Sequence, residues 1–593
     1  MISESGPDSA RVRYCESRRL HLVGGGGRDN TIDIEKDIVS DPSVIAEHTR
    51  LGQASVEGLP DPYPDETALE FARRDVTDLV NALVNVWADR LNSRHSKNYS
   101  VDFWRMLLLP WLCEIVQRTH ARWRSLELIA AEHAAGSVQV RTIETNHLWP
   151  FLDVRSFQEH LYHHEKFGWW LDSVLLDHLS SPAFKIEVIR VDPELPVPKA
   201  SESGIGRIGF LRRAKLSIGL TDIIGARYWG LFLAIYASMI GGRVQQRDMQ
   251  PRTLPDWHHK FPAGFLNAID QILTATIPKT YTDNFRTLEM LGQSFRYRKG
   301  RVRIGSIDYW NDEEKIVAAL AREAGENFAV TQHGSFYGQM RYNVLATEGE
   351  YKYGRFFSWG FDKHDDYVAD FTPLPSPYLA KLRDRHRLRN NELIIVGDPI
   401  RFGVTRIAPQ PRGGEWLNYC SDTVEFLSTL DDEKLDNTVF RPYVNAQTDI
   451  TDEHIVRDFP QVGRLEGDLH ARMCSCRLLV LCSPNTTMIL AMAANVPMVA
   501  FWRPEYFSLS PTAQPFFEEL RSAGILFHSP REAASTVNGV WKRSSEWWSH
   551  PVRQSARRNW SKQFARSDRN WRSAWIREIL KTAYPSKREK WCR

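Results

Sequence analysis

The sequence predicts an α/β protein with two Rossmann-like domains, and three observations lead to this fold class. The chain has 593 residues, more than a single hydrophobic core normally holds. In its second half, short apolar segments alternate with helical segments, which is typical of a parallel sheet. Several of the apolar segments end in loops rich in glycine, serine or threonine, and parallel α/β folds bind ligands at such strand ends.

The strands expected in the second half are short apolar segments, each followed by a loop or turn. They are residues 301–306, 328–331, 356–359, 392–396, 438–441, 477–481 and 496–502. Helices are expected between strands, at 311–324 and from Thr486 to Ala494. Strand, helix and strand in this order give parallel neighbours joined by crossover helices.

The N-terminal half adds helices to this plan. Apolar residues near a 3.6-residue period predict a long helix at 66–95, and a second helix is expected through Trp111 to about residue 129. A short strand that ends in Gly24 to Gly27 and a strand at 184–191 are also expected. Residues 228–240 are apolar but shorter than the ~20 residues of a membrane span, so a buried helix is predicted there.

Four segments follow from these patterns. We expect a disordered tail at 1–18, an N-terminal Rossmann-like domain with a helical insertion at 19–385, a second Rossmann-like domain at 386–555 and a basic, aromatic C-terminal helix at 556–593. Three prolines and many charges between residues 372 and 391 indicate a hinge between the two domains.

Composition excludes several classes of protein. The 76 basic and 73 acidic residues give a net charge of +3, whereas a nucleic-acid binder has a clearly basic domain, so no nucleic-acid partner is expected. Seven cysteines are too few for a disulfide framework and fit a reducing cytoplasm. The first nine residues are polar and lack the apolar core of a signal peptide. We therefore expect a cytoplasmic protein.

The C-terminal region is unusually basic. From Trp541 to Arg593 it has 15 Lys or Arg residues against four Asp or Glu, and Trp560, Phe564, Trp571 and Trp575 fall on one helical stripe. The favoured interpretation is a helix that packs back on the body with a solvated basic face. Peripheral contact with an anionic inner membrane is the second interpretation, because basic aromatic segments bind such surfaces, and contact with nucleic acid is the third.

The most informative segment is the strand at 477–481 with the turn and helix that follow it. The helix N-terminus presents free amide groups and a partial positive charge, which bind phosphate. Ser483, Asn485, Thr486 and Thr487 surround this end of the helix and are candidate donor-binding residues. The alternative is plain N-capping, for which serine, asparagine and threonine are equally suited.

A second segment with chemistry runs from Gln332 to Gly338. His333 follows an apolar strand, and an imidazole at a strand end can take a proton from an attacking hydroxyl near neutral pH. Glu350 could orient His333 or act as the base itself. The alternative is a loop histidine whose ring is satisfied by backbone hydrogen bonds.

Two arginines at strand ends are further candidates for donor phosphate contacts. Arg441 ends the strand at 438–441, and Arg401 follows the loop after the strand at 392–396. A guanidinium group matches phosphate with its fork of donors. No metal site is expected, because His160, His163 and His164 lack a fourth partner at a diagnostic spacing.

Several segments spread over roughly residues 20–580 match one known family. They are 92–111 with His95 and Trp104, Gln332-His333-Gly334 with Tyr337 and Gly338, Thr486-Thr487, 493–497, 501–506, Trp547-Trp548 and Phe564-Ala565. Together they resemble the signatures of bacterial transferases of O-antigen (surface carbohydrate) biosynthesis. The histidine-glycine segment and the threonine-capped helix are also similar to the GT-B transferases of capsule and teichoic-acid synthesis.

This resemblance implies a GT-B arrangement of the two domains, with the base on the N-terminal, acceptor side and the donor nucleotide on the C-terminal domain. It implies a glycosyltransferase that moves a sugar from a nucleotide sugar onto a polysaccharide or lipid-linked glycan, such as lipopolysaccharide, without a cofactor or metal. His95, Trp104, Gln332, Gly334 and Tyr337 would be acceptor contacts or structural residues of the motifs.

The sequence departs from that family at three places. Cys482 and Leu490 stand where acids are usual, and the first strand ends in four glycines instead of Gly-Glu-Trp-Cys. Two alternative functions therefore stay open. One is another reaction on the same fold, such as transfer of a polyol phosphate or epimerisation of a nucleotide sugar. The other is an inactive module that binds polysaccharide or acts as a scaffold.

Overall fold

The computed structural model describes residues 18–21, 37–39, 57–146, 148–149, 151–163, 165–189, 213, 215–217, 219–220, 225–226, 228–240, 260–398, 407, 411, 415–443 and 450–583. Three features of the sequence prediction lie outside these residues: the tail before Arg18, the four glycines Gly24 to Gly27, and Arg401. Arg18 itself, expected in the tail, begins the first strand.

The described strands form three sheets in which every pair of neighbours is parallel, which confirms the predicted α/β class. The first sheet has the order β3 (Glu57–Gly58), β2 (Asp37–Val39), β1 (Arg18–His21), β4 (Val138–Ile143), β5 (Phe184–Ile189). The second has the order β6 (Val302–Gly305), β7 (Asn327–Thr331), β8 (Gly354–Ser358), β9 (Asp370–Pro373). The third has the order β12 (Gly463–Arg464), β11 (Thr438–Arg441), β10 (Leu393–Val396), β13 (Leu478–Leu481), β14 (Met498–Phe501), β15 (Leu526–Phe527).

The third sheet has the strand order of the Rossmann fold. Its first strand along the chain, β10, lies in the middle, with the next two strands on one side and the last three on the other. The strand order reverses between β10 and β13, and open α/β sheets bind ligands outside the carboxyl ends of the strands at such a point. The residues after Val396 and Leu481 are therefore placed to meet a ligand.

Helices cover the sheets and connect their strands. Those before the third sheet are α2 (Glu66–His95), α3 (Val101–Glu132), α4 (Val154–His163), α5 (Glu165–Leu179), α7 (Tyr228–Ile240), α8 (Ala263–Thr276), α9 (Phe285–Gln293), α10 (Asp312–Glu323) and α11 (Pro377–Leu382). Those from the third sheet onward are α12 (Glu415–Thr429), α13 (Asp432–Leu435), α14 (Ile450–Asp458), α15 (Leu469–Met473), α16 (Thr486–Ala494), α17 (Gln514–Ser522), α18 (Pro530–Val540), α19 (Ser544–Ser549), α20 (Pro551–Phe564) and α21 (Trp571–Ala583). Short 3₁₀ turns span Lys279–Tyr281, Pro504–Tyr506 and Trp541–Arg543, and a π-helical turn spans Ala346–Glu350.

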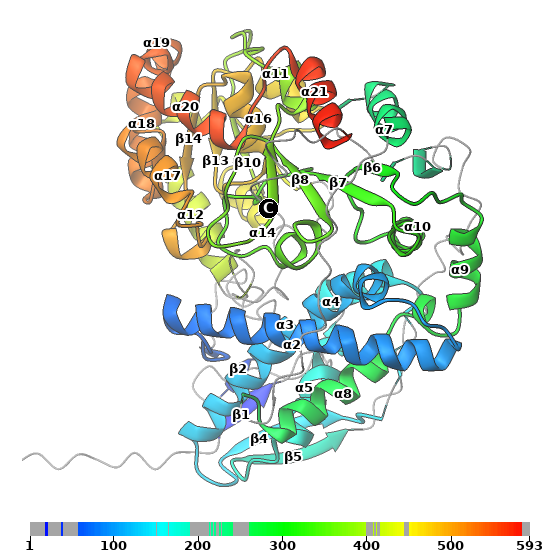
Figure 1. Cartoon of the computed structure of the whole chain (residues 1–593). Helices are drawn as coiled ribbons and strands as arrows, with labels where there is room; N and C mark the ends of the chain where they lie inside the picture. Colours follow the sequence, from blue (N-terminus) through cyan, green and yellow to red (C-terminus); the bar gives the residue numbers. More distant parts are fainter. Residues whose placement is uncertain are drawn as a thin grey trace, which may run out of the picture.

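The N-terminal half contains two sheets separated by helices. In Figure 1 the first sheet lies at the bottom, α2 and α3 cross the middle, and the second and third sheets lie above them. Helix α2 has the bounds that the sequence predicts, because Asp65 caps its start and Ser96 ends it in the left-handed region, with φ at 52°. The buried residues of α2 and α3 belong to one core with the first two sheets.

The C-terminal helices return from the third sheet to the second. The end of α20 packs so closely on Gly360 that a Cβ there would lie 2.4 Å from the carbonyl oxygen of Lys562. The indole Nε1 of Trp575 in α21 then donates to the carbonyl of Pro375 at 2.9 Å. This confirms the expected packing of a C-terminal helix on the body. The predicted segment boundary at residue 556 falls inside α20, which begins with Pro551 in its first turn.

Helix α7 differs from the prediction of a buried helix. Its inner residues, such as Leu233 and Ala237, pack against the second sheet and α21. Its outer residues are exposed, Tyr228 by 88% and Met239 by 74%. The sequence could not reveal this, because apolar residues occupy both faces. Among the described residues, no helix combines the length and the apolar character that crossing a bilayer requires.

Candidate active site

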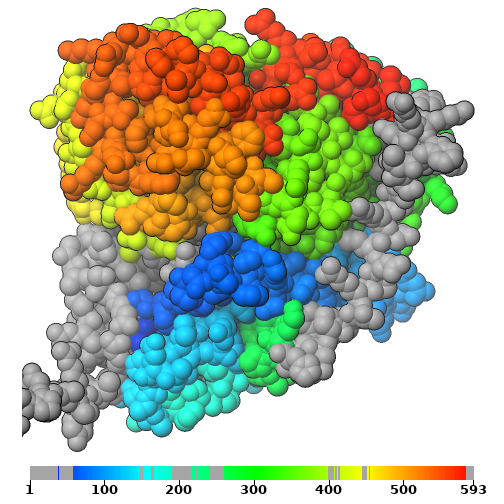
Figure 2. All heavy atoms as spheres, turned by 60° about the vertical axis from the view of Figure 1, so that its left-hand side comes forward, coloured from blue at the N-terminus to red at the C-terminus, as the bar shows by residue number. Residues whose placement is uncertain are grey.

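The two motifs that stood out in the sequence meet in the structure. The loop after β7 contacts the start of α16, where the backbone N–H of Ser335 donates to Oγ1 of Thr486 at 3.2 Å. The Thr486 hydroxyl donates in turn to Oγ of Ser335 at 3.2 Å. The carboxyl edges of the second and third sheets therefore face one place, as the predicted GT-B arrangement requires. Figure 2 shows these central (green) and C-terminal (orange) parts side by side above the helices of the N-terminal half (blue).

The loop from Gln332 to Gly338 is held in one shape by its own side chains. Buried Gln332 donates from Nε2 to the carbonyl of Gly334 at 2.8 Å and accepts from the N–H of Trp359 at 2.7 Å. Gly338 has a φ of +69°, and a Cβ there would lie 2.7 Å from the Phe361 ring. Gln332 therefore positions the residue between it and Gly334, which is His333.

His333 stands at the open side of this loop. Its side chain is 38% exposed, and its Nδ1 lies 3.1 Å from the hydroxyl of Tyr337 and 3.7 Å from Oε1 of Glu350. Desolvation by the surrounding protein disfavours the charged ring and lowers the pKa of His333 to about 4. At neutral pH the imidazole is therefore uncharged and able to accept a proton.

Glu350 lies beneath His333 at the end of the π-helical turn and is fully buried. Burial raises the pKa of the Glu350 carboxyl to about 8, and the neighbouring Tyr337 hydroxyl offsets part of this rise. The turn is tightly packed, since a Cβ on Gly349 would lie 2.5 Å from the hydroxyl oxygen of Tyr309. A buried acid beside an exposed imidazole is an arrangement that often marks catalytic sites.

A cavity of about 580 Å³ opens beside this loop at the carboxyl edge of the third sheet. Its lining comes from the ends of β10, β11, β12 and β13 or the segments after them, from the loop after β7, from α12 and from Phe507. The residues are Ser335, Phe336, Val396, Gly397, Asp398, Trp416, Arg441, Pro442, Tyr443, Gly467, Asp468, Leu469, His470, Asn485, Thr486, Thr487 and Phe507. Volume and position match a small-molecule site at the reversal of strand order.

The start of α16 forms one wall of this cavity. Asn485 caps the helix by accepting from the backbone N–H of Thr487 at 2.9 Å. Its Nδ2 donates across the reversal point to the carboxylate of Asp398 at 2.9 Å. The cap leaves Thr487 on the cavity wall beside a helix end that carries partial positive charge.

The lining also contains Arg441 and His470. The Arg441 guanidinium donates from Nη1 to the carbonyl of Leu465 at 2.9 Å and also lines the cavity. His470 is held by the hydroxyl of Tyr378 at 2.7 Å from its Nδ1. A Cβ on Gly397 would lie 2.8 Å from the Phe440 ring, so this position admits only glycine without rearrangement. The lining thus includes a guanidinium group and an imidazole.

Three positions near α16 are buried and do not line the cavity: the predicted donor residue Ser483, and Cys482 and Leu490, which stand where acids are usual in the resembled family. Ser483 is buried, and its hydroxyl is without a hydrogen-bond partner in the part of the chain that the structure describes. Cys482 is buried too, and burial raises the pKa of its thiol to about 12. Leu490 is 2% exposed in the core of the third sheet. The absence of an acid at Leu490 therefore changes the core and leaves the cavity wall as it is.

His95 and Trp104 contribute to packing between helices. The Nε2 of His95 lies 2.9 Å from the carbonyl of Tyr281, and its ring stacks on Phe285 with centroids 4.5 Å apart. Trp104 is fully buried and donates from its indole to the side chain of Asn92 at 2.9 Å. This motif fixes the corner between α2, α3 and α9, so its contacts are those of structural residues.

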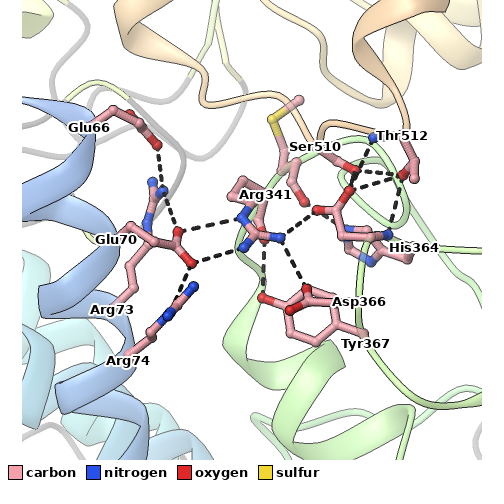
Figure 3. Close-up of polar contacts among 12 residues, drawn as sticks. Glu66, Glu70, Arg73, Arg74, Arg341, His364, Asp366, Tyr367, Ser510 and Thr512 are labelled. Carbon is pink, nitrogen blue, oxygen red and sulfur yellow. Dashed lines mark hydrogen bonds and ion pairs between the residues drawn. The ribbon is translucent and has the colours of Figure 1, made fainter.

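A larger cavity of about 1430 Å³ lies where α2, the segment 363–366 and the segment 502–528 meet. Phe507 lines both cavities, so they are neighbours. A polar network stands at its edge, shown in Figure 3. There Arg341 pairs with Glu70 of α2 at 2.9 Å and with Asp365 at 2.9 Å. Asp365 also accepts from the backbone N–H of Thr512 at 3.1 Å.

Sequence reasoning missed part of the lining. Asp468 and His470 came from no motif, although Asp468 has a local signal: its side chain caps α15 by accepting from the N–H groups of His470 and Ala471. Trp416 lies in a helix, and only the tertiary fold brings it to the strand ends. No group of three or more metal-ligating side chains was found within the described part of the chain.

Comparisons with known proteins place this geometry in a family. Three solved structures, each 12% identical, are similar at low scores. The N-terminal domain of Candida albicans trehalose-6-phosphate phosphatase matches over 77% of this chain and 92% of that chain, with a TM-score of 0.30. WaaG, a glycosyltransferase involved in lipopolysaccharide biosynthesis, matches over 39% of this chain and 63% of that chain, with a TM-score of 0.24, and a mutant of the Thermobaculum terrenum O-GlcNAc transferase matches over 86% and 80%, with a TM-score of 0.25. Likeness at these scores carries no argument for the present chain. No curated protein matches it. A family model of transferases does match, over residues 35–579, and the chain belongs to the LIC12162 family of transferases.

Proposed function

We propose that this transferase is a GT-B glycosyltransferase that moves a sugar from a nucleotide sugar to a glycan hydroxyl. The observation that carries the proposal is the contact between the loop after β7 and the start of α16. An uncharged imidazole, His333, stands on the loop after β7, and that loop contacts the helix end that forms a wall of the adjoining cavity. Transfer to a hydroxyl needs a base and a place for the leaving phosphate, and these two features suit the two tasks.

The cavity beside α16 would hold the donor. The helix N-terminus, the hydroxyls of Thr486 and Thr487, and the Arg441 guanidinium suit the two phosphates of a nucleotide. The carboxylates of Asp398 and Asp468 lie in the same lining and could accept hydrogen bonds from sugar hydroxyls. These protein groups could carry the leaving phosphate's charge without a metal ion.

The reaction would proceed by attack of the acceptor hydroxyl on the anomeric carbon of the donor sugar. A carbon–oxygen bond forms to the acceptor as the bond to the donor phosphate oxygen breaks, and the hydroxyl proton passes to His333. The nucleotide leaves with its charge held by the helix end and Arg441. Glu350, 3.7 Å from His333, would stabilise the imidazolium once the carboxyl is ionised.

The nature of the acceptor rests on the sequence resemblance to O-antigen biosynthesis transferases. We extend the proposal to a surface polysaccharide or lipid-linked glycan, such as lipopolysaccharide, as acceptor, and to a cytoplasmic site of action. The matching motifs include Gln332-His333-Gly334 and Thr486-Thr487, and Ser335, the residue after the first motif, hydrogen-bonds with Thr486 of the second.

A thermal-shift panel tests the donor site. CMP, CDP, UDP, GDP and dTDP and their sugar forms would be added to the wild type and to Thr487→Ala. Binding to the folded state raises the melting temperature by mass action, so one base should give a rise that the variant loses. A rise with one nucleotide that Thr487→Ala leaves unchanged would move the donor away from α16. Nucleotide binding without turnover on any glycan would favour an inactive binding module, and release of a polyol phosphate or an epimer would identify another reaction on this fold.

A further inference from the structure

Helix α7 is apolar on all sides although half of it faces outward. Its sequence, Tyr228–Ile240, contains no charged residue. One face packs on the second sheet through Leu233, Ala234 and Ala237. A helix that is apolar all round is normally covered on every side, by protein or by lipid. The outer face of α7 therefore lacks the charged residues that a water-facing surface would carry.

The exposed residues of α7 form a continuous stripe. They are spaced by three or four residues, as neighbours on one helix face are. They are Tyr228, Trp229, Leu231, Phe232, Ile235 and Met239, with exposed fractions from 37% for Trp229 to 88% for Tyr228. Single exposed apolar side chains are ordinary, but a contiguous stripe marks an interaction surface.

Basic helix α21 lies against α7, and the two are seen side by side at the upper right of Figure 1. The rings of Trp229 and Trp571 meet edge to face at 6.2 Å. The guanidinium of Arg572 covers both rings, 5.1 Å from the centroid of Trp229 and 4.9 Å from that of Trp571. A cation is thus fixed at the border of the apolar stripe.

Helix α21 and the residues just before it carry an excess of positive charge, and Arg572 is the cation that borders the stripe. Exposed cations on and just before α21 are Arg569, Arg572, Arg577 and Lys581. The acids nearby are already paired: Glu578 with Arg355 at 3.1 Å and with Lys581 at 3.2 Å, and Asp568 with Arg566 at 2.8 Å. Beyond α21 the sequence continues with four more basic residues and one acidic residue up to Arg593.

We infer that the outer face of α7, together with the basic border formed by α21, docks on an anionic lipid bilayer. Aromatic and aliphatic side chains would enter the boundary between headgroups and acyl chains, and the arginines would meet anionic headgroups. A second copy of the chain is a poorer occupant, because a symmetric contact would bring the same arginines against each other. The surface is distinct from the proposed donor cavity, so the inference does not depend on the glycosyltransferase proposal.

Vesicle sedimentation with the full chain tests this docking. Vesicles of phosphatidylcholine containing about one quarter phosphatidylglycerol should bind the protein, and pure phosphatidylcholine vesicles should bind it weakly. The double variants Phe232→Gln/Met239→Gln and Arg572→Gln/Arg577→Gln should each lower the partition coefficient by at least about fivefold. The matched control is Met290→Gln, which changes a side chain that is 60% exposed on α9, away from the stripe.

Several outcomes would overturn the inference. Equal binding to neutral and anionic vesicles would remove the role of the arginines, and unchanged binding of the α7 variant would remove the role of the stripe. A change of oligomeric state in light scattering, without a change in vesicle binding, would assign the stripe to a second copy. Melting temperatures of the variants close to that of the wild type would show that the side chains act at the surface and that the fold is intact.

Discussion

His333 and Glu350 lie 3.7 Å apart, and their pKa values move in opposite directions. Burial disfavours a charge on either group, so it lowers the pKa of the imidazole and raises the pKa of the carboxyl. With a pKa of about 4 for the imidazole and about 8 for the carboxyl, both are uncharged near pH 7. Loss of a proton from Glu350 would place a negative charge beside the ring and make His333 a stronger base. The pair therefore couples the strength of the base to the protonation of a group that solvent cannot reach.

Replacement of His333 tests the residue that would take the proton. His333→Ala should lower turnover by at least about 100-fold, because general-base catalysis commonly contributes this much. Donor binding should change little, since the ring does not line the donor cavity. Turnover assays and nucleotide thermal shifts on the same preparation measure the two effects. Turnover close to that of the wild type would make His333 a structural residue.

The buried carboxyl predicts a pH dependence of stability. The folded pKa of Glu350, about 8, lies above the value of about 4.3 for an unfolded chain, so the folded state holds one more proton between these values and loses stability as pH rises. Glu350→Gln removes this loss, and its stability relative to the wild type should grow by roughly 3 to 5 kcal/mol from about pH 5 to pH 8. Urea unfolding at several pH values measures it.

The control for this prediction is Glu505→Gln, which changes an exposed acid. Its stability relative to the wild type should stay flat over the same pH range. A flat profile for Glu350→Gln as well would mean that water reaches the carboxyl.

Site residues could be predicted from the sequence where a recognisable motif follows a predicted strand. His333, Asn485, Thr486 and Thr487 lie in segments that follow apolar strands, and the structure brings these segments into contact through Ser335 and Thr486. His470 could not be found in this way, because it joins the cavity through the packing of α15. The exposure of such a side chain is decided by tertiary contacts that no local pattern records.

At the scale of elements, one side chain at the start of α16, Asn485, makes two contacts with different roles. Asn485 caps the helix and binds Asp398 of the neighbouring strand end. Asn485→Ala should destabilise the protein by about 1 kcal/mol through the lost cap and weaken nucleotide binding. Asn485→Asp keeps the cap but sets a second carboxylate against Asp398, so it should bind phosphate less well than Asn485→Ala does. Thermal shifts with the donor nucleotide rank the three proteins.

Seven of the ten described strands in the second and third sheets were predictable because each is a short, mostly apolar run. Strands β9, β12 and β15 were not predicted, because β12 and β15 have two residues each and β9 is partly exposed. The observed β10, Leu393–Val396, and β13, Leu478–Leu481, lie within the predicted segments 392–396 and 477–481. The separate first sheet was not foreseen. Its strands β2 and β3 have three and two residues, too few to show a period, and pairing of β1 with β4 spans α2 and α3.

At the scale of the whole molecule, Arg341 joins three parts of the chain. It binds Glu70 of α2 and Asp365 of the central part, and Asp365 in turn binds Ser510 and Thr512 of the C-terminal part. Arg341→Met should destabilise the protein by about 2 kcal/mol, since it leaves Asp365, which is 3% exposed, without its cation. Urea unfolding measures the loss.

Arg74→Met is the matched control for Arg341→Met. Arg74 pairs with the same carboxylate, Glu70, at 3.4 Å, but its side chain is 64% exposed. Exposed pairs contribute on the order of 0 to 1 kcal/mol, so this variant should stay close to the wild type. Equal losses in both variants would mean that the charge of Glu70, and not the junction of the three parts, decides the effect.

The parallel pairing of β1 with β4 has a consequence for how the chain is made. Arg18–His21 leaves the ribosome early, but its partner Val138–Ile143 follows only after the whole of α2 and α3. Contacts so distant along the chain form slowly, because the loop between them must close first. During synthesis β2 can pair with one edge of β1 early, but the edge that β4 covers stays open while the two long helices form. Chaperones that bind extended segments, or slower synthesis at low temperature, should raise the yield of folded protein.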